Sequence, residues 1–452
     1  MFRKKLASLA LAAVLTLGVT TSVFAAEENN NINIQLNGSN ITFNDTKPIF
    51  QNNSSYTPFK ETFEALGASV SYDEATKTYT AKKDSTTITY KDGDSKLTIE
   101  KDGKSESKDF EAPDGYIPAR IAAETFGYTA GWDSSNKTVI IADKNTLFSK
   151  LGEYTVMDKY LAYCNEFSNK QLALKGTFDF NYEINAGEEK LPVTGTGTID
   201  GITDSEKLNM EMAMKLDFSK LIELNDELSE EKLQQGIDLF GDIKMNFIVD
   251  LSNGKYYINS PLLAKMIGNT VTENTWLMID LNDMLKQTGS SNFSFKDIAE
   301  MSKSANFKTY MEAILNSVSY TNINDYKSME QFVDVMNQLF SDAAFKKEGN
   351  TYQSNYNITE DGTAVSLGMT LIEENDKITG YSFDMTVSDS TANMKIKASQ
   401  NENNVTTNMS FSISSLLNMV MNMNMDYSDT SETPISAPSS DSNIIPFTQI
   451  LK

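Results

Sequence analysis

Residues 116–142 read YIPARIAAETFGYTAGWDSSNKTVIIA, and this stretch decides how the first part of the chain folds. Sixty residues earlier, residues 56–81 read YTPFKETFEALGASVSYDEATKTYTA. The two stretches align without a gap over residues 116–141, and they share a proline, a glutamate, a glycine and an aspartate at equal spacing. Self-similarity at a fixed offset indicates a repeated supersecondary unit.

Both copies predict the same local structure. A proline (Pro58, Pro118) is expected to begin a short helix, because a helix makes no use of the first N–H groups that proline lacks. A glycine (Gly67, Gly127) is expected to end the helix in a left-handed conformation. A strand, an aspartate-containing turn and a second strand then follow. Further hairpins are expected at residues 32–43 and 86–110.

The first residues form a targeting segment. A basic start (Arg3, Lys4, Lys5) precedes the apolar run 6–19, and Val23-Phe24-Ala25 provides the small residues of a signal peptidase site. We therefore expect residues 1–25 to be a signal peptide that is cleaved after Ala25, giving a secreted or cell-surface protein. No later stretch is long and apolar enough to predict a transmembrane segment.

The composition excludes several classes of function. The chain of 452 residues carries a formal net charge of −23, which disfavours binding to the phosphates of nucleic acids. It contains no histidine and one cysteine, Cys164, so histidine-based nucleophile pairs, zinc sites and intramolecular disulfides are excluded. Cys164 stands among apolar residues at helical spacing, so we expect a buried thiol. Phosphate-binding loops and nucleophile elbows are also missing. The sequence predicts no catalytic residue, no metal site and no cofactor.

The second copy resembles a known stalk domain. Its pattern of Tyr-x-Pro-x-Arg, glutamate, glycine, Trp-Asp and Lys-Thr-Val is similar to the N-terminal domain of copper amine oxidases, over about residues 32–145. The first copy departs from that pattern at Lys60 and Tyr72. The resemblance implies a small antiparallel sheet wrapped on a helix, used as an appendage in exported bacterial surface proteins. It implies no copper chemistry, because the chain lacks the histidines of such a site.

Five residues of the second copy form a candidate binding or structural motif: Tyr116, Arg120, Glu124, Trp132 and Asp133. Arg120 and Glu124 are four residues apart, on one face of the expected helix. One interpretation is an ion pair from Arg120 to Glu124 or to Asp133 that braces the helix against the hairpin. The alternative is recognition of a carboxylate or a sugar by Arg120 with Tyr116 and Trp132.

After residue 145 the pattern changes. Helical spacing predicts one or two helices in residues 147–174, and further helices at 219–240, 293–318 and 326–345. Alternating apolar residues predict about ten strands between residues 175 and 413, with one polar face and one apolar, methionine-rich face. Five methionines, expected to fill the core or to line a ligand cavity, are Met210, Met212, Met214, Met369 and Met385. Residues 428–452 are rich in Ser, Thr and Pro, which favours a flexible tail.

The fold class expected is therefore α+β. A duplicated sheet-plus-helix stalk domain (residues 26–145) precedes a larger antiparallel β-sheet module (146–427) with helices segregated on one side. The second region distantly resembles exported lipoprotein carriers, in strand order and in the segments Gly-Lys-Tyr-Tyr and Trp-Leu-Met-Ile-Asp-Leu.

Three functions follow as hypotheses. The first is a non-catalytic exported protein whose stalk presents a module that binds a cell-envelope component. The second is a carrier of a hydrophobic ligand, a lipid or lipoprotein, held in a half-barrel. The third is a hydrolase of cell-wall glycans. The sequence does not specify the ligand, the mode of surface attachment or the oligomeric state.

Overall fold

The computed structural model describes residues 32–44, 46–168, 170–186, 189–217, 242–261, 272, 274–283, 306–360, 362–413 and 416–447. The signal peptide, the helix expected at 219–240 and residues 293–305 of the helix expected at 293–318 lie outside these residues. The chain forms two compact units. The N-terminal unit comprises residues 32–151 together with 315–334, and the sheet unit comprises the remaining described residues from 152 to 447.

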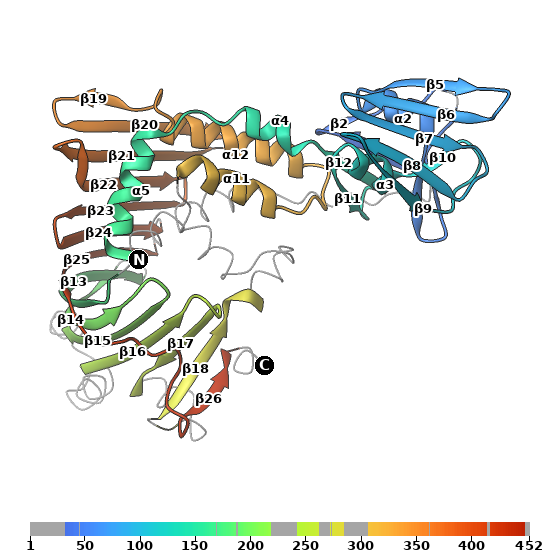
Figure 1. Cartoon of the computed structure of the whole chain (residues 1–452). Helices are drawn as coiled ribbons and strands as arrows, with labels where there is room; N and C mark the ends of the chain where they lie inside the picture. Colours follow the sequence, from blue (N-terminus) through green and yellow to red (C-terminus); the bar gives the residue numbers. More distant parts are fainter. Residues whose placement is uncertain are drawn as a thin grey trace. The chain divides into compact units, whose positions relative to one another are not determined.

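The N-terminal unit contains three small sheets and short helices (Figure 1). The strand orders are β11-β12-β1-β2, β10-β4-β3 and β5-β6-β7-β8-β9. Its elements are β1 (Asn33–Leu36), β2 (Ser39–Asn40), β3 (Ile49–Gln51), β4 (Ser54–Pro58), α2 (Phe59–Ala65), β5 (Ser69–Asp73), β6 (Thr78–Lys83), β7 (Thr86–Lys91), β8 (Lys96–Lys101), β9 (Lys104–Asp109), β10 (Tyr116–Pro118), α3 (Ala119–Thr125), β11 (Thr129–Asp133), β12 (Thr138–Ala142) and α4 (Lys144–Ser149). The order strand, helix, strand, strand occurs twice, as β4-α2-β5-β6 and β10-α3-β11-β12.

Local chemistry begins and ends α2 and α3 as the sequence predicts. Pro58 and Pro118 are the N-cap residues. Gly67 and Gly127 adopt φ values of 85° and 79°, in the left-handed region that glycine tolerates. In the first copy, Gly67 N donates to Glu64 O at 3.0 Å, and the next N–H donates to Phe63 O at 2.8 Å. This pair of bonds satisfies carbonyls that the helix end would otherwise leave unpaired.

The core of this unit lies between the helices and the sheets. The fully buried rings of Phe59 and Phe63 have centroids 4.5 Å apart, and Tyr90 packs against Phe59 at 5.8 Å. Lys83 Nζ donates to Leu66 O at 2.8 Å at the carboxyl end of α2, and its charge lies 4.8 Å from the ring centroid of Tyr128. A cation at this end of a helix opposes the helix dipole.

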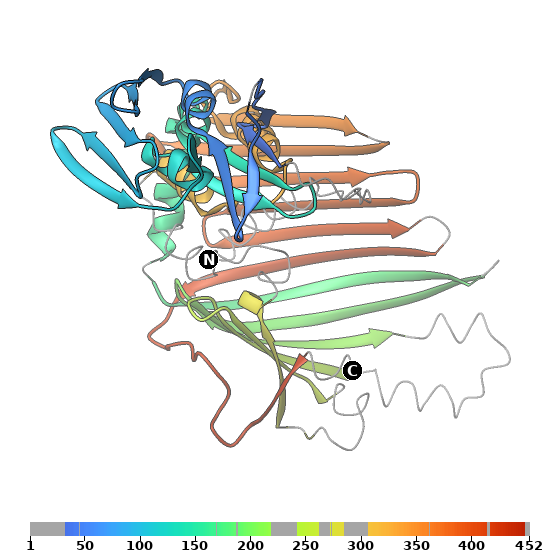
Figure 2. The same cartoon turned by 90° about the vertical axis from the view of Figure 1, so that its right-hand side faces the viewer.

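The sheet unit is built on one 14-stranded sheet (Figures 1 and 2). The strand order is β19-β20-β21-β22-β23-β24-β25-β13-β14-β15-β16-β17-β18-β26, antiparallel except where β26 pairs with β18. The strands are β13 (Leu172–Ala186), β14 (Glu189–Thr203), β15 (Lys207–Asp217), β16 (Asp242–Asp250), β17 (Lys255–Asn259), β18 (Thr275–Asp280), β19 (Lys346–Glu348), β20 (Thr351–Glu360), β21 (Thr363–Glu374), β22 (Lys377–Ser388), β23 (Ala392–Asn401), β24 (Asn404–Ile413), β25 (Leu417–Asp429) and β26 (Asn443–Pro446).

One face of this sheet is apolar and the other polar. We call the apolar side the inner face; α5 (Thr155–Ser168) packs on it, where Tyr160 and Tyr381 have ring centroids 5.5 Å apart. Polar side chains, such as those of Asn408 and Asn422, alternate with the apolar ones and lie on the outer face. Sequence alternation with period two predicts this arrangement, and the expected α+β fold with one apolar, methionine-rich face is confirmed.

Glycines allow the sheet to curl where β13, β14 and β15 meet. A Cβ at Gly197 would lie 2.2 Å from Phe178 Cζ, and a Cβ at Gly195 would lie 2.4 Å from the Phe180 ring. Both phenylalanines extend across the neighbouring strand and cover these glycines on the inner face. Sheet curvature commonly uses glycine kinks of this kind, with an aromatic side chain filling the space.

Helices α11 (Phe307–Ser317) and α12 (Asp325–Phe340) complete the described fold. Phe307 of α11 packs against Phe340 of α12 and against Tyr154, with centroid distances of 5.5 and 5.1 Å. Within the described part of the chain, no helix is long and apolar enough to cross a membrane.

Two findings differ from the sequence analysis. The strand β25 was not expected, although Leu417, Met419, Met421, Met423, Met425 and Tyr427 alternate along it. Within the segment for which a flexible tail is expected, Asn443–Pro446 form β26.

Candidate functional site

The five residues of the predicted motif lie on β10, α3 and β11 of the N-terminal unit. Tyr116 is partly exposed, and its hydroxyl donates to Lys47 O at 2.9 Å. Trp132 is partly exposed and stacks on Phe50, with ring centroids 5.4 Å apart and an interplanar angle of 14°. Both aromatic residues therefore contact the segment of residues 47–50, which fixes its position against the second copy.

The ion pair expected for Arg120 does not form among the described residues. Arg120 and Glu124 are both exposed on α3. Asp133 is 2% exposed, and N–H groups occupy its carboxylate instead. The expectation of a bracing pair is wrong, because an exposed arginine on a helix gains little from a carboxylate that is exposed as well.

Asp133 instead joins its own turn to a remote segment. Oδ1 accepts from Ser135 N at 2.9 Å and from Asn136 N at 3.0 Å. Oδ2 accepts from Asn136 Nδ2 at 2.8 Å and from Ile323 N at 3.0 Å. Burial acts to raise the pKa of Asp133, but these hydrogen bonds outweigh it and lower the pKa below its usual value.

Gly131 makes room for the same remote segment. A Cβ at this position would lie 1.5 Å from the carbonyl oxygen of Tyr320, a distance that no side chain tolerates. Ser71 occupies the equivalent position in the first copy and is exposed. The aspartate of that copy, Asp73, is exposed and accepts only local bonds, from Ala75 N and Thr76 N. Residues 315–334 therefore pack against the strand and turn of the second copy, at Gly131 and Asp133, and not against the equivalent residues of the first.

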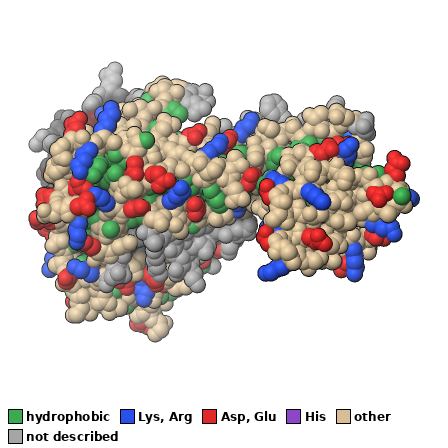
Figure 3. All heavy atoms as spheres, turned by 45° about the horizontal axis from the view of Figure 1, so that its top comes forward, with side chains coloured by type: hydrophobic (Ala, Val, Ile, Leu, Met, Phe, Trp, Pro, Cys, Tyr) green, Lys and Arg blue, Asp and Glu red, His purple; other side chains and the backbone are tan. Residues whose placement is uncertain are grey.

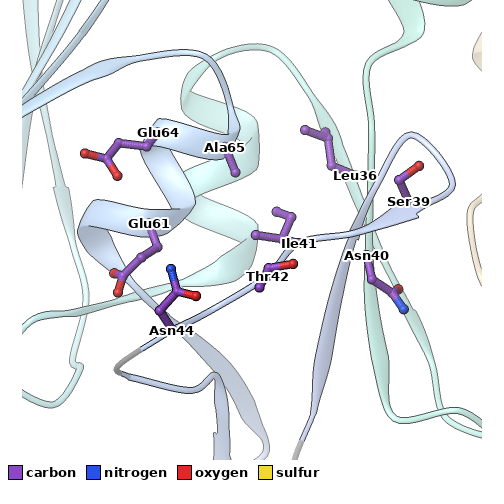
Figure 4. Close-up of a pocket in the computed structure, with 9 residues that line it drawn as sticks. All are labelled: Leu36, Ser39, Asn40, Ile41, Thr42, Asn44, Glu61, Glu64 and Ala65. Carbon is purple, nitrogen blue, oxygen red and sulfur yellow. The ribbon is translucent and has the colours of Figure 1, made fainter.

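A surface pocket of about 400 Å³ lies between α2 and the segment that follows β1 (Figure 4). Glu61 and Glu64 project from one side of α2, and Asn44 lies next to Glu61. The pocket is open, and polar residues make up most of its lining: Leu36, Ser39, Asn40, Ile41, Thr42, Asn44, Glu61, Glu64 and Ala65. Two carboxyl groups and several amide or hydroxyl groups suit a ligand that presents N–H or O–H donors. None of the five predicted motif residues lines it.

The inner face of the sheet unit is an apolar surface. Near α5 its residues are buried: Leu371 is fully buried, Val405 is 1% exposed and Met425 is 1% exposed. Further along β23, β24, β25 and β13 the side chains become partly exposed, as in the cross-strand row Ile396, Met409, Met421 and Phe180. Along β21 they stay buried, as at Met369 and Leu367. We call the partly exposed region the open end of the inner face. The four side chains of the row are all apolar. An apolar surface that is half covered is a common feature of sites for hydrophobic ligands.

The methionines named in the sequence analysis divide between the two regions. Met369 and Met385 are 5% and 8% exposed, so they belong to the core. Met210, Met212 and Met214 are partly exposed and pack at the edge of an apolar cluster around Leu208 and Ile199.

No metal-binding cluster of the usual types is found in the residues that the structure describes. None of their His, Cys, Asp and Glu side chains gather in groups of three or more that could hold a metal ion. Cys164 is buried in α5, as expected. Lysines and acidic side chains are interspersed over the visible faces of both units (Figure 3).

Comparison with known proteins identifies the N-terminal unit. Residues 35–141 are a copper amine oxidase N-terminal domain, the family that the sequence pattern predicts. This domain is typical of exported bacterial cell-surface proteins.

The other comparisons add little. No curated protein matches the chain. Among solved structures, the chain is similar to the outer membrane protein Omp33 of Acinetobacter baumannii at 5% identity, covering 57% of this chain and 99% of that chain, with a TM-score of 0.11. A mutant porin of Rhodopseudomonas blastica gives 7% identity, the same two coverages and a TM-score of 0.10. Similarity at this level does not bear on fold or function.

Proposed function

We propose that this protein is a non-catalytic, exported bacterial surface or extracellular protein. In this proposal the copper amine oxidase N-terminal domain, with its two copies, supports the sheet unit, and the sheet unit binds the ligand. The observation that carries the proposal is the domain at residues 35–141, which is typical of exported proteins. The expected signal peptide at residues 1–25 supports the same conclusion.

The test is the location and the N-terminus of the protein in a bacterium that exports it. We expect the protein outside the cytoplasmic membrane, with a mature chain that begins at Ala26. A chain with an intact N-terminus that stays wholly in the cytoplasm would contradict the proposal. The non-catalytic part is tested separately, because the purified chain should leave cell-wall glycans unchanged.

The open end of the inner face favours a second candidate, a carrier of a hydrophobic ligand. The row Ile396, Met409, Met421 and Phe180 leaves apolar side chains partly exposed, although most of the inner face near α5 is buried. Native mass spectrometry after gentle purification would show a bound lipid as extra mass, and extraction with organic solvent would remove that mass. A chain of unmodified mass throughout would exclude the carrier.

A further inference from the structure

Two sets of four methionines repeat one arrangement on the inner face. In the set that we call the β25 quartet, Met419, Met421 and Met423 alternate along β25. Met409 of β24 lies directly opposite Met421, the central member. All four side chains are partly exposed.

The second set, the β15 quartet, has the same design. Met210, Met212 and Met214 alternate along β15, and Met245 of β16 lies directly opposite Met212. These four side chains are partly exposed as well. Each quartet thus consists of three alternate methionines on one strand and a fourth on the neighbouring strand. The fourth methionine lies directly opposite the central methionine of the three.

This arrangement allows several sulfur atoms to reach one point. Alternate residues of a strand share one face of the sheet. Residues directly opposite each other on antiparallel strands have Cβ atoms about 5 Å apart. Because methionine has three rotatable bonds beyond its backbone, the sulfurs of the opposed pair and of a flanking methionine can converge. Partial exposure leaves this point accessible from solvent.

Thioether sulfur is a soft, neutral ligand that selects Cu(I) over hard cations such as Mg²⁺ and Ca²⁺. The chain has no histidine, and its one cysteine is buried, so thioethers are the soft donors that remain within reach of solvent. We propose that each quartet binds one soft monovalent cation, Cu(I) or its analogue Ag(I). The proposal concerns the sheet unit alone and does not depend on which ligand that unit carries, nor on the N-terminal domain.

Apolar packing accounts for Met425 in full, whereas Met210, Met212, Met214 and Met423 pack only at the edge of the apolar cluster and stay partly exposed. Met425, on the same strand and the same face, is 1% exposed and lies opposite Val405. Packing of this kind needs neither a second methionine directly opposite nor access to solvent. Met425 is therefore the matched control for the β25 quartet.

The experiment counts bound ions on the mature full chain. Native mass spectrometry with Ag(I), and competition for Cu(I) against a chromophoric Cu(I) chelator without oxygen, should both give two ions per chain. Replacing the β25 quartet by leucine (Met409→Leu, Met419→Leu, Met421→Leu, Met423→Leu) should leave one ion, and replacing both quartets should leave none. The control Met425→Leu should still bind two. A wild-type chain that binds none, or variants of both quartets that still bind two, would overturn the proposal.

Two further readouts do not depend on how well the leucine variants fold. Thioethers carry no proton that a metal must displace, so the Cu(I) affinity should change by less than about threefold between pH 5 and pH 8. Bound Ag(I) should also protect the quartet methionines of the wild-type chain from oxidation by hydrogen peroxide, while Met278 and Met394, which are partly exposed and belong to neither quartet, gain oxygen. A steep pH dependence, or oxidation of the quartets at the same rate with and without Ag(I), would count against sulfur ligation.

Discussion

The carboxylate of Asp133 accepts hydrogen bonds from two sides, from its own turn and from Ile323, which is 190 residues further along the chain. Its partner in the first copy, Asp73, closes the same turn but lies in solvent. The two aspartates therefore perform one local task, and Asp133 alone performs a second, long-range one. This difference allows the two tasks to be separated by experiment.

Replacing Asp133 by asparagine should destabilise the N-terminal unit by about 2 kcal/mol, because buried hydrogen bonds to a charged acceptor are lost. The amide can accept at one atom only, and its NH₂ group would face the N–H donors of Asn136 and Ile323. Chemical unfolding followed by tryptophan fluorescence would measure the change. Asp73→Asn is the control and should have a smaller effect; equal effects would show that the remote bond contributes nothing.

The carboxylate of Asp133 should also make the stability of the N-terminal unit depend on pH in the acid range. The pKa of Asp133 is lowered in the folded state, so its contribution is present above the unfolded value of about 3.9 and is lost as the pH falls through the lowered folded value. Unfolding midpoints of the wild type should fall over this acid range more steeply than those of Asp133→Asn. Parallel curves would argue against the lowered pKa.

Glu373 gives the sheet unit a similar acid dependence. Its side chain is 10% exposed and bonds Lys159 Nζ at 2.7 Å, and Lys347 Nζ bonds the other oxygen. The hydrogen bonds from Lys159 and Lys347 lower the pKa of Glu373 to about 2. Its contribution to stability should therefore be lost as the pH falls from about 4.5 towards 2. Glu373→Gln should flatten this decline in urea unfolding followed by circular dichroism. Glu374→Gln, at the exposed neighbouring position, should leave the decline unchanged.

At the scale of single elements, β14 depends on the glycines that face Phe178 and Phe180. Gly197→Ala would place a Cβ 2.2 Å from Phe178 Cζ and 2.6 Å from the carbonyl oxygen of Ala213. We expect a destabilisation of about 1–3 kcal/mol, the usual cost of overpacking. Gly368→Ala is the matched strand control, because its nearest neighbour is the Asn355 side-chain oxygen at 3.0 Å, which can move. Unfolding midpoints that are the same for both variants would contradict the role of Gly197.

Most elements could be predicted from local chemistry, because their signals lie within a few residues. Proline, glycine and aspartate specify α2, α3 and the turns between strands, and period-two alternation specifies the strands of the sheet unit. The strand β25 carries the same alternation, so it too has a local signal in the sequence. The curl of the sheet could not be predicted from local sequence. Phe178 covers Gly197 only when β13 and β14 are paired, and no short-range pattern specifies that pairing.

The long-range contacts of the predicted motif could not be predicted from the sequence. The sequence indicates that Trp132 and Asp133 matter, and both hold the N-terminal unit together through residues that no short-range pattern links to them. Phe50 lies 82 positions before Trp132, and Ile323 lies 190 positions after Asp133. One local signal does exist. The second copy has a glycine, Gly131, at the position within the strand where the first copy has Ser71.

At the scale of the whole molecule, the N-terminal unit is not one continuous stretch of chain. Residues 315–334 complete it, through Tyr320, which is 2% exposed, and Ile323. A fragment of residues 32–151 should therefore be less stable than the unit in the full chain. A synthetic peptide of residues 311–336 should raise the melting temperature of that fragment in proportion to its concentration, as expected for a ligand of the folded state.

The control for that experiment is the fragment with Gly131→Ala, whose added Cβ occupies the place of the Tyr320 carbonyl oxygen. The peptide should no longer raise its melting temperature. Equal stabilisation of both fragments, or of neither, would mean that residues 315–334 do not complete the unit as described.

This discontinuity has a consequence for proteolysis. From residue 32 onward, where the described part of the chain begins, the chain passes between the two units after residues 151, 314 and 334. A protease that cuts once near residue 151 severs the first passage only. The fragment on the N-terminal side of the cut still binds residues 315–334 through the hydrogen bond between Asp133 and Ile323 N. Residues 315–334 remain covalently joined to the sheet unit on both sides. A single cut at this junction would thus leave the N-terminal unit attached to the sheet unit, so release of the N-terminal unit would need a second cut.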